Sequence, residues 1–183
     1  MAADPSPLHG QRLLVCVCGG IAAYKAADLV RRLRDAGADV RVAMTESAQQ
    51  FVSATTFQAV SHHPVRTTLW DAGAEAAMGH IELARWATRI VVAPATANTL
   101  AKLAHGFADN LVTTLCLATT APLTVCPAMN HCMWLHPATQ ANMALLRERG
   151  AQVIGPEDGP LAEGESGPGR LAEPAAIVAA LPA

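Results

Sequence analysis

Residues 13–23 read LLVCVCGGIAA, an unbroken apolar run that ends in two glycines and continues into small, helix-forming residues. A continuous apolar run, unlike an alternation of apolar and polar residues, indicates a strand that is buried on both faces. Gly19 and Gly20 predict a tight turn at the carboxyl end of this strand, and the helical pattern of Ala22–Ala36 stops at Gly37. The stretch is therefore typical of the first strand–turn–helix unit of a parallel α/β sheet.

The same pattern recurs along the rest of the chain. The predicted buried strands are Leu13–Cys18, Asp39–Met44, Arg89–Pro94, Leu123–Cys126 and Ala151–Ile154. Helical patterns lie between them, at Ala22–Ala36, Thr99–Leu117 with a break near Gly106, and Pro137–Arg149. Loops are expected at Asp71–Gly79 and Gly155–Gly169. The alternation predicts an α/β fold, a Rossmann-like three-layer α/β/α sandwich with an open parallel sheet and right-handed crossovers.

Composition limits the class of protein. The chain has 183 residues, 51% of them hydrophobic and 15% charged, so one domain with a packed core is expected. The 13 Lys and Arg against 15 Asp and Glu give a net charge of −2, which excludes a basic surface for nucleic acid or an anionic membrane. Polar residues interrupt every apolar stretch, so no transmembrane helix is expected. We interpret the high mean hydropathy of +0.24 as surface buried between copies of the chain.

The N-terminus and the cysteines indicate in which cellular compartment the protein is expected. Residues 1–11 contain no basic segment followed by an apolar one, so we expect a disordered lead-in rather than a signal peptide, and a single domain over residues 12–183. No CxxC pair occurs among the five cysteines, which supports neither a zinc site nor a disulfide framework. Reduced thiols and the lack of a leader predict a cytoplasmic protein.

Polar side chains follow two of the predicted strands. Thr96, Asn98 and Thr99 come directly after Arg89–Pro94, and Asn130 follows Leu123–Cys126. Open α/β sheets bind ligands at the carboxyl ends of their strands, so these residues are candidates for a polar cradle. The alternative for each is a helix cap, and one of Thr96, Asn98 and Thr99 is expected to serve as one.

Two further segments contain candidate functional side chains. His80 lies beside an acid and a base in GHIELARW, residues 79–86, where a loop becomes a helix. Three glycines and a proline precede Arg170 in residues 164–170, which predicts a flexible flap with a cation at its base. The alternatives are a structural histidine and a plain surface turn.

Six motifs occur in one order, and together they resemble the homo-oligomeric flavin-containing cysteine decarboxylases. They are GGIAAYK (19–25), MTESAQQF (44–51), GHIELARWA (79–87), PATANTLAKLAHGFADNL (94–111), PAMNHCMW (127–134) and GESGPGRLAEP (164–174). Within that family the chain is most similar to the phosphopantothenoylcysteine decarboxylase domain of bacterial coenzyme A biosynthesis. The resemblance implies a flavoprotein domain that binds FMN near a subunit interface and assembles as a homotrimer or a dodecamer.

The resemblance also implies roles for individual residues. His80 matches the catalytic histidine of the family, and Asn130 matches the residue that holds the substrate carboxylate. The residues implied to bind the cofactor are Gly20, Ile21, Ala22, Thr45, Ser47, Ser53, Thr96, Ala97, Asn98, Thr99 and Ala128. Those implied to lie near the substrate are Lys25, Arg85, Asn130, Met133 and Arg170. No metal is implied.

The implied reaction is the decarboxylation of 4′-phosphopantothenoylcysteine to 4′-phosphopantetheine through a thioaldehyde and an enethiolate. FMN supplies the redox chemistry, and His80 serves as a base or proton shuttle. Many family members have a flap cysteine that protonates the enethiolate, and here Glu163 occupies that place. A carboxylic acid kept protonated by burial could donate this proton.

The alternative is that the final reduction is lost, as in the decarboxylases that act on the C-terminal cysteine of a peptide in lanthipeptide-like pathways. The presence of both His80 and Asn130 argues against a non-catalytic flavin-binding regulatory subunit, and the PAMN motif argues against a flavin prenyltransferase. Family members are often joined to a phosphopantothenate–cysteine ligase, so such a domain is a possible partner.

Overall fold

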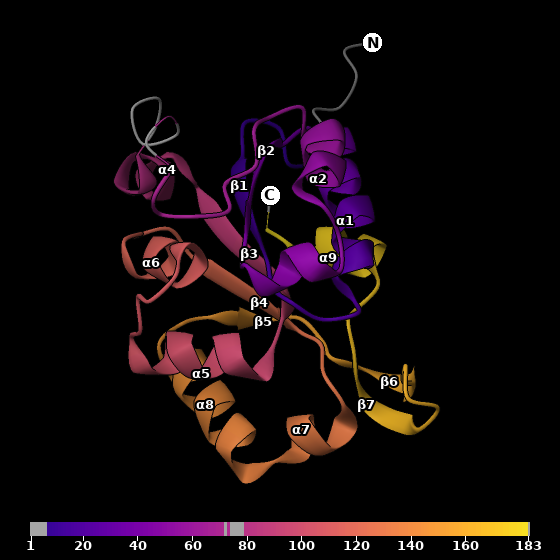
Figure 1. The fold of residues 1–183 in the computed structure, drawn as a ribbon. Coiled ribbons are helices and arrows are strands. Elements are labelled where there is room, and N and C mark those ends of the chain that lie inside the picture. The colour runs from indigo at the N-terminus through magenta and orange to yellow at the C-terminus, as the bar shows by residue number, and fades with distance from the viewer. Residues whose placement is uncertain (1–6, 72, 74–78, 183) are drawn as a thin grey trace.

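Five parallel strands form the central sheet of the protein, in the order β2-β1-β3-β4-β5 (Figure 1). The computed structural model describes residues 7–71, 73 and 79–182. The strands of the sheet are β1 (Arg12–Val17), β2 (Asp39–Met44), β3 (Arg89–Ala95), β4 (Leu123–Pro127) and β5 (Gln152–Val153). Both neighbours of β1 pair with it in parallel, β2 on one side and β3 on the other.

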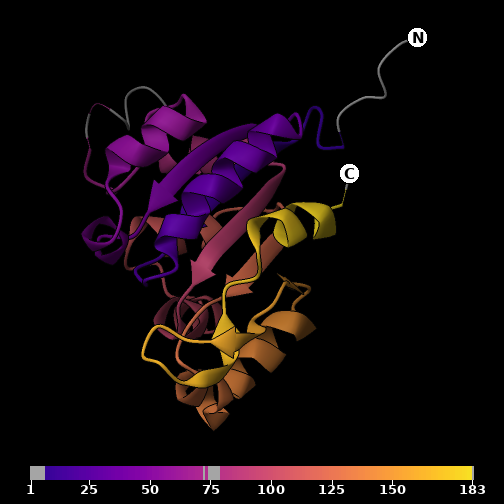
Figure 2. The same cartoon turned by 90° about the vertical axis from the view of Figure 1, so that its right-hand side faces the viewer.

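Helices cover both faces of this sheet and give the three layers seen in Figures 1 and 2. One face is covered by α1 (Ala23–Asp35), α2 (Ala54–Ser61) and α9 (Pro174–Ala180). The other face is covered by α4 (His80–Trp86), α5 (Ala97–His105), α6 (Leu111–Leu117) and α8 (Pro137–Glu148). Two shorter elements, η1 (Ser47–Gln50) and α7 (His131–Leu135), follow β2 and β4. The predicted three-layer α/β/α fold is confirmed.

Alternation along the strands divides the core into two clusters. In β1, Val15 and Val17 pack beneath α1 and α9, whereas Leu14 and Cys16 pack beneath the helices of the opposite face. All four side chains are fully buried. Because both faces of β1 are covered, its sequence has no polar alternation, as the apolar run predicted.

The predicted elements agree closely with those of the structure. β2 has the bounds that were predicted for it, and α1 lies one residue inside its predicted range at each end. The helical pattern of residues 99–117 divides at Gly106, whose φ of +71° ends α5. Thr96 caps α5, so this helix begins at Ala97 rather than at Thr99.

The prediction of a loop at Gly155–Gly169 was wrong. This stretch contains most of an antiparallel hairpin, formed by β6 (Glu157–Pro160) and β7 (Ser166–Arg170). Glycine and proline make up much of both strands and have low β-propensity, so the residue pattern did not reveal them. A two-stranded hairpin tolerates its prolines because each strand has a free edge. The other predicted loop, Asp71–Gly79, falls mainly on residues outside those described.

Residues 7–11, the end of the expected lead-in, lie against the folded part of the chain. Leu8 is only 2% exposed, and its backbone N–H donates to the Ala36 carbonyl at 3.0 Å. The start of the described chain therefore packs against the end of α1, and residues 1–6 lie outside the description. Among the described helices, none is long and apolar enough to cross a bilayer.

Candidate active site

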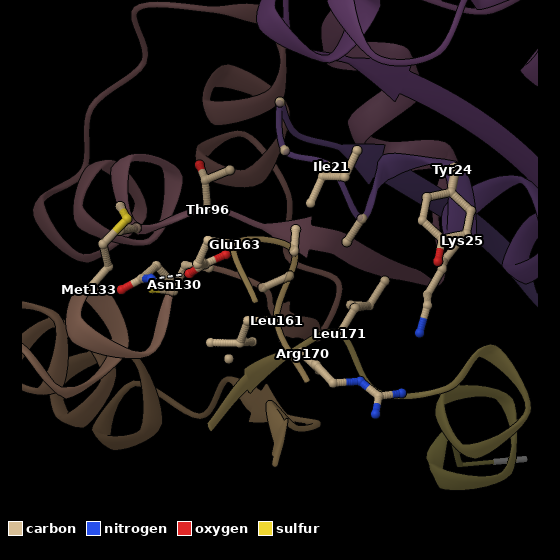
Figure 3. A pocket seen from close by; sticks show the side chains of 18 of the residues that line it. Ile21, Tyr24, Lys25, Thr96, Asn130, Met133, Leu161, Glu163, Arg170 and Leu171 are labelled. Carbon is tan, nitrogen blue, oxygen red and sulfur yellow. Dashed lines mark hydrogen bonds between the residues drawn. The ribbon is translucent and has the colours of Figure 1, made fainter. Parts of the chain in front are cut away.

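The carboxyl ends of the central strands meet the β6–β7 hairpin around one cavity of about 760 Å³ (Figure 3). The strand order reverses direction between β1 and β3, and ligands of open α/β sheets bind at such a switch point. The order 2-1-3-4-5 is that of the flavodoxin-like fold, in which this point holds FMN. The residues lining the cavity are Gly19, Gly20, Ile21, Ala22, Tyr24, Lys25, Ser47, Thr96, Ala97, Asn98, Ala128, Met129, Asn130, Met133, Pro160, Leu161, Ala162, Glu163, Gly169, Arg170 and Leu171.

One wall of the cavity consists of the turns that follow β1, β3 and β4. A Cβ atom on Gly19 would overlap the side chain of Ser47, so only glycine allows η1 to lie this close to β1. At Gly20 a Cβ atom would meet only Thr96, at 3.8 Å. Gly20 therefore leaves its backbone open to the cavity, whereas Gly19 serves packing. We call the turns after β1, β3 and β4 the sheet wall.

The two threonines after β3 also stabilise the start of α5. The Thr96 hydroxyl accepts the Thr99 backbone N–H at 3.2 Å and donates to the Thr99 hydroxyl at 3.1 Å. Thr99 points away from the cavity and is buried beside Cys18. Burial raises the pKa of the Cys18 thiol to about 12. Thr96 thus lines the cavity and caps α5, and Thr99 supports it from behind.

The opposite wall is the β6–β7 hairpin with its connecting residues 161–165, which we call the flap. Its base is joined to the sheet wall where the Met129 N–H donates to the Gly169 carbonyl at 2.9 Å. A Cβ atom on Gly169 would collide with the Met129 carbonyl oxygen, so the chains cross here at the closest distance that glycine allows. The tip of the flap contributes Leu161, Ala162 and Glu163 to the cavity.

Asn130 faces the tip of the flap. Its Oδ1 accepts the Cys132 backbone N–H at 2.8 Å, and its Nδ2 donates to the Glu163 carboxylate, as Figure 3 shows. Glu165 Oε2 lies 3.5 Å from the same Nδ2 and 3.2 Å from His131 Nδ1. Two flap carboxylates are therefore held at the start of α7.

A cationic group lies on the other side of the cavity. Lys25 Nζ is 2.8 Å from Glu173 Oε1, and Arg170 Nη2 is 3.0 Å from the same oxygen. The hydrogen bond from Lys25, with the charges of Lys25 and Arg170, lowers the pKa of Glu173 below its ordinary value. Two cations share this carboxylate, and a second carboxylate, that of Glu157, accepts the Glu173 backbone N–H at 3.3 Å.

His131, Glu163 and Glu165 each have a possible metal-ligand atom, and these atoms lie within 4.8 Å of one another. The carboxylates of Glu163 and Glu165 already face Asn130 and His131, and both acids are exposed. Exposed acids commonly lie this close without a metal ion. We interpret the group as a set of contacts that holds the flap closed.

Most residues predicted for the site lie together at this cavity. The predicted residues that line it are Gly20, Ile21, Ala22, Lys25, Ser47, Thr96, Ala97, Asn98, Ala128, Asn130, Met133, Glu163 and Arg170. Two others lie close behind, since Thr45 is 3.1 Å from Ser47 through their hydroxyls and Thr99 supports Thr96. Ser53 caps α2, where its hydroxyl accepts the Thr56 N–H at 3.4 Å.

His80 and Arg85 do not line the cavity. Both belong to α4, which packs against α6, and Figure 1 shows this helix far from the β6–β7 hairpin. Among the described residues, no residue of α4 contributes to the cavity wall. Glu163 lines the cavity but is exposed, so the chain by itself does not supply the burial on which its predicted role as an acid depends.

Sequence reasoning missed several apolar residues of the cavity, among them Tyr24, Leu161 and Leu171. Leu161 and Leu171 lie just outside the Gly-rich segment of the flap, and only the pairing of β6 with β7 brings them to the cavity. Tyr24 lies in the first turn of α1, four residues after Gly20. That spacing from the turn is a signal that could have identified it.

Comparison with known proteins shows the family of the chain. The chain matches the Flavoprotein family over residues 1–183. It is 54% identical over 171 residues to the coenzyme A biosynthesis bifunctional protein CoaBC of Escherichia coli strain K12, which covers 93% of this chain. The match includes only 42% of CoaBC, so the chain spans less than half the length of this curated relative.

Two solved structures share the fold of this chain. A mutant PPC decarboxylase in complex with pantothenoylaminoethenethiol superposes with a TM-score of 0.81 at 36% identity, covering 92% of this chain and 94% of that one. The FMN-dependent cysteine decarboxylase SpaF superposes with a TM-score of 0.80 at 34% identity, covering 94% of this chain and 96% of that one.

Proposed function

The chain belongs to the Flavoprotein family, and on this premise we propose that it is an FMN-dependent decarboxylase that converts 4′-phosphopantothenoylcysteine to 4′-phosphopantetheine. The observation that carries the proposal is the position of the Asn130 amide. It lies at the cavity formed by the family motifs and already donates to a carboxylate, that of Glu163. The 54% identity to CoaBC supports this substrate. Because the chain spans 42% of that relative, we assign it the decarboxylase activity alone.

The residues of the cavity fit FMN. The volume of about 760 Å³ lies within the ~300–1,000 Å³ typical of small-molecule and cofactor sites. Gly20 leaves room for close approach to the backbone, and Ile21 and Ala22 provide apolar surface beside it. Ser47 contributes a hydroxyl that Thr45 orients, which suits a phosphate or a ribityl chain. Ala97, Asn98 and Ala128 would complete the cradle on the sheet wall.

When bound, FMN would supply the redox chemistry of the reaction. The chain's own residues bind and position the substrate. Asn130 donates hydrogen bonds to the substrate carboxylate, and Met133 and Leu161 exclude water from its surroundings. Lys25 and Arg170 lie on the other side of the cavity, where their positive charge suits the phosphate of the substrate (Figure 3).

We further propose that His80 serves the cavity of a neighbouring copy in a homotrimer or a dodecamer. His80 lies on α4, away from the cavity of its own chain. Large apolar side chains at the cavity remain exposed in the single chain, with Ile21 at 62%, Tyr24 at 61% and Met133 at 49%. A second copy would cover this surface and could bring the imidazole, the base or proton shuttle, to the substrate, with Arg85 from the same helix.

Mixing of inactive variants tests this arrangement. His80→Asn and Asn130→Asp should each lose decarboxylation by at least about a hundredfold while retaining bound FMN. If His80 acts on a neighbouring copy, dissociation and reassembly of the two variants together should restore part of the wild-type rate. Native mass spectrometry would give the number of copies. Mixtures that contain both variants in one assembly, yet remain inactive, would place His80 and Asn130 in the site of one chain.

The substrate is tested by mass spectrometry of the product after incubation of the FMN-loaded protein with 4′-phosphopantothenoylcysteine. Loss of CO₂ alone would mean that reduction follows decarboxylation and would support the proposal, with Glu163 as the candidate proton donor. Loss of CO₂ and two hydrogens would mean that the reaction ends at the enethiol. No reaction with the FMN-loaded protein would contradict the proposed substrate.

Decarboxylation of the C-terminal cysteine of a peptide is the second candidate. It is favoured by Glu163, which stands where many family members have the cysteine that completes the reduction. A peptide with a C-terminal cysteine, assayed in parallel, distinguishes the two.

The partners that follow from the proposal are a second copy of this chain and a phosphopantothenate–cysteine ligase. Such a ligase would make 4′-phosphopantothenoylcysteine, the proposed substrate. The length of CoaBC beyond the matched region supports the ligase partner. All five cysteines are free, as expected for the cytoplasm, where we place the reaction.

A further inference from the structure

The side-chain amide of Asn130 has a defined orientation. Its Oδ1 accepts the Cys132 N–H at 2.8 Å, and this bond fixes which end of the amide faces the flap. An amide nitrogen only donates, so Nδ2 presents two N–H groups toward the tip of the flap. Asn130 is therefore a donor site that suits an anionic oxygen.

The chain's own carboxylates occupy this donor site. Nδ2 donates to Glu163, and Glu165 lies 3.5 Å away on the same side. Glu165 Oε2 also lies 3.2 Å from His131 Nδ1, although that nitrogen makes no hydrogen bond among the described residues, and Glu163 has no other partner among them. The two acids are thus not equivalent, since Glu163 makes the closer contact with Asn130 and Glu165 lies at the limit of hydrogen-bond distance.

We propose that Glu163 is an internal competitor for the carboxylate site of the substrate, which must displace it from Asn130 in order to bind. The inference rests on the proposed function for the identity of the substrate, but it needs only a ligand that ends in a carboxylate. A second carboxylate brought to Asn130 would meet the negative charges of Glu163 and Glu165 at close range. Binding therefore requires the tip of the flap to move away.

Occupation of the site by Glu163 selects among ligands. A ligand with a carboxylate gains the Asn130 hydrogen bonds in return for displacing Glu163, whereas one without a carboxylate does not compete for them. A site that is open for only a fraction of the time has its apparent affinity reduced by that fraction. Removal of the Glu163 carboxylate should therefore strengthen binding of carboxylate ligands selectively.

The test uses two unreactive ligands with the FMN-loaded protein. 4′-Phosphopantothenoylserine has the carboxylate but no thiol, and 4′-phosphopantothenoylethanolamine has neither. By titration calorimetry at neutral pH, Glu163→Ala should bind the serine ligand about tenfold more tightly than the wild type does. Its affinity for the ethanolamine ligand should remain within about twofold, and Glu163→Gln should give an intermediate gain.

Glu165→Gln is the control matched to Glu163→Gln, because each removes one charge from the same flap but only Glu165→Gln leaves the Glu163 contact; it should therefore strengthen binding of the serine ligand by less. If the gain came only from a looser flap, this variant would strengthen both ligands as much as Glu163→Ala does. That result would overturn the proposal, as would an equal gain of Glu163→Ala for the two ligands or no gain at all.

A second measurement separates this proposal from the choice of substrate. N-Acetylserine and N-acetylethanolamine represent the end shared by the small-molecule and the peptide substrates. In Glu163→Ala, N-acetylserine should shift the side-chain NH₂ resonances of Asn130 in a nitrogen–proton NMR spectrum, and N-acetylethanolamine should not. Unshifted resonances would overturn the proposal. A shift, combined with no binding of either phosphopantothenoyl ligand, would instead contradict the proposed substrate.

Discussion

The sheet wall and the flap face each other across one cavity, but different kinds of contact hold them in place. In the sheet wall, backbone hydrogen bonds join neighbouring turns: Cys18 N–H donates to the Pro94 carbonyl at 3.3 Å, and Ala128 N–H donates to the Ala95 carbonyl at 3.0 Å. In the flap, side chains make the contacts at the tip, from Glu163 to Asn130 and from Glu165 to His131.

This difference separates two tasks. Buried backbone hydrogen bonds open only with large parts of the fold, whereas exposed side-chain contacts break and re-form readily. A cofactor that stays bound through many turnovers suits the sheet wall, and a substrate that must enter and leave suits the flap. Changes to the sheet wall should therefore affect FMN, and changes to the flap should affect substrate exchange.

The largest effect is expected from Gly19→Ala, which breaks the sheet wall. The new methyl group would overlap Ser47, including its backbone, so η1 would have to move. Overpacking of this kind costs about 1–3 kcal/mol of unfolding free energy. Displacement of Ser47, which lines the cavity, should also weaken FMN binding by about tenfold, or about 1.4 kcal/mol. Flavin absorbance during titration of the apoprotein measures the affinity, and thermal unfolding measures the stability.

Gly20→Ala is the control for that experiment. Its methyl group would meet only Thr96 at an ordinary distance, so the melting temperature of the apoprotein should stay close to that of the wild type. The added methyl group would face the cavity, and FMN binding should weaken without loss of stability. Unchanged FMN affinity in both variants would contradict the assignment of the sheet wall to the cofactor.

The smallest effect is expected from Glu173→Gln, which tests whether an ion pair helps to hold the base of the flap against α1. Glu173 joins Lys25 of α1 to Arg170 of β7. These partners lower the pKa of Glu173 in the folded protein, so its carboxylate stabilises the fold above the unfolded pKa near 4.5. That contribution is lost as the pH falls through the lower folded value. Because the side chain is half exposed, the substitution should cost less than about 1 kcal/mol at pH 7, and the cost should shrink as the pH falls below 4.5.

Asp28→Asn is a matched control within α1. Asp28 pairs with Arg32 at 2.6 Å, and that hydrogen bond lowers its pKa in the same direction. Both variants should therefore lose a similar, small part of the stability by chemical denaturation at pH 7. Hydrogen exchange of residues 157–170 should increase only in Glu173→Gln. Equal exchange in the two variants would mean that Glu173 does not hold the base of the flap.

Local patterns predicted the parallel sheet well because its strands are marked by their own residues. The apolar run of β1 is continuous because helices cover both of its faces, and α1, α5 and α8 end beside Gly37, Gly106 and Gly150. The β6–β7 hairpin could not be predicted in this way. Its strands pair Gly159 with Gly167, residues that carry no local preference for a strand.

The motifs of the site could also be predicted from the sequence, but the contacts between them in space could not. The sequence by itself determined the α/β alternation, the glycine turn after β1 and the Asn130 motif after β4, because each depends on residues close together in the chain. Only the tertiary structure decided that Glu163 reaches Asn130 across 33 residues, that Thr99 turns toward Cys18, and that α4 lies away from the cavity. The physical reason is that these contacts depend on how separate elements pack, and packing is set by the whole core rather than by any local pattern.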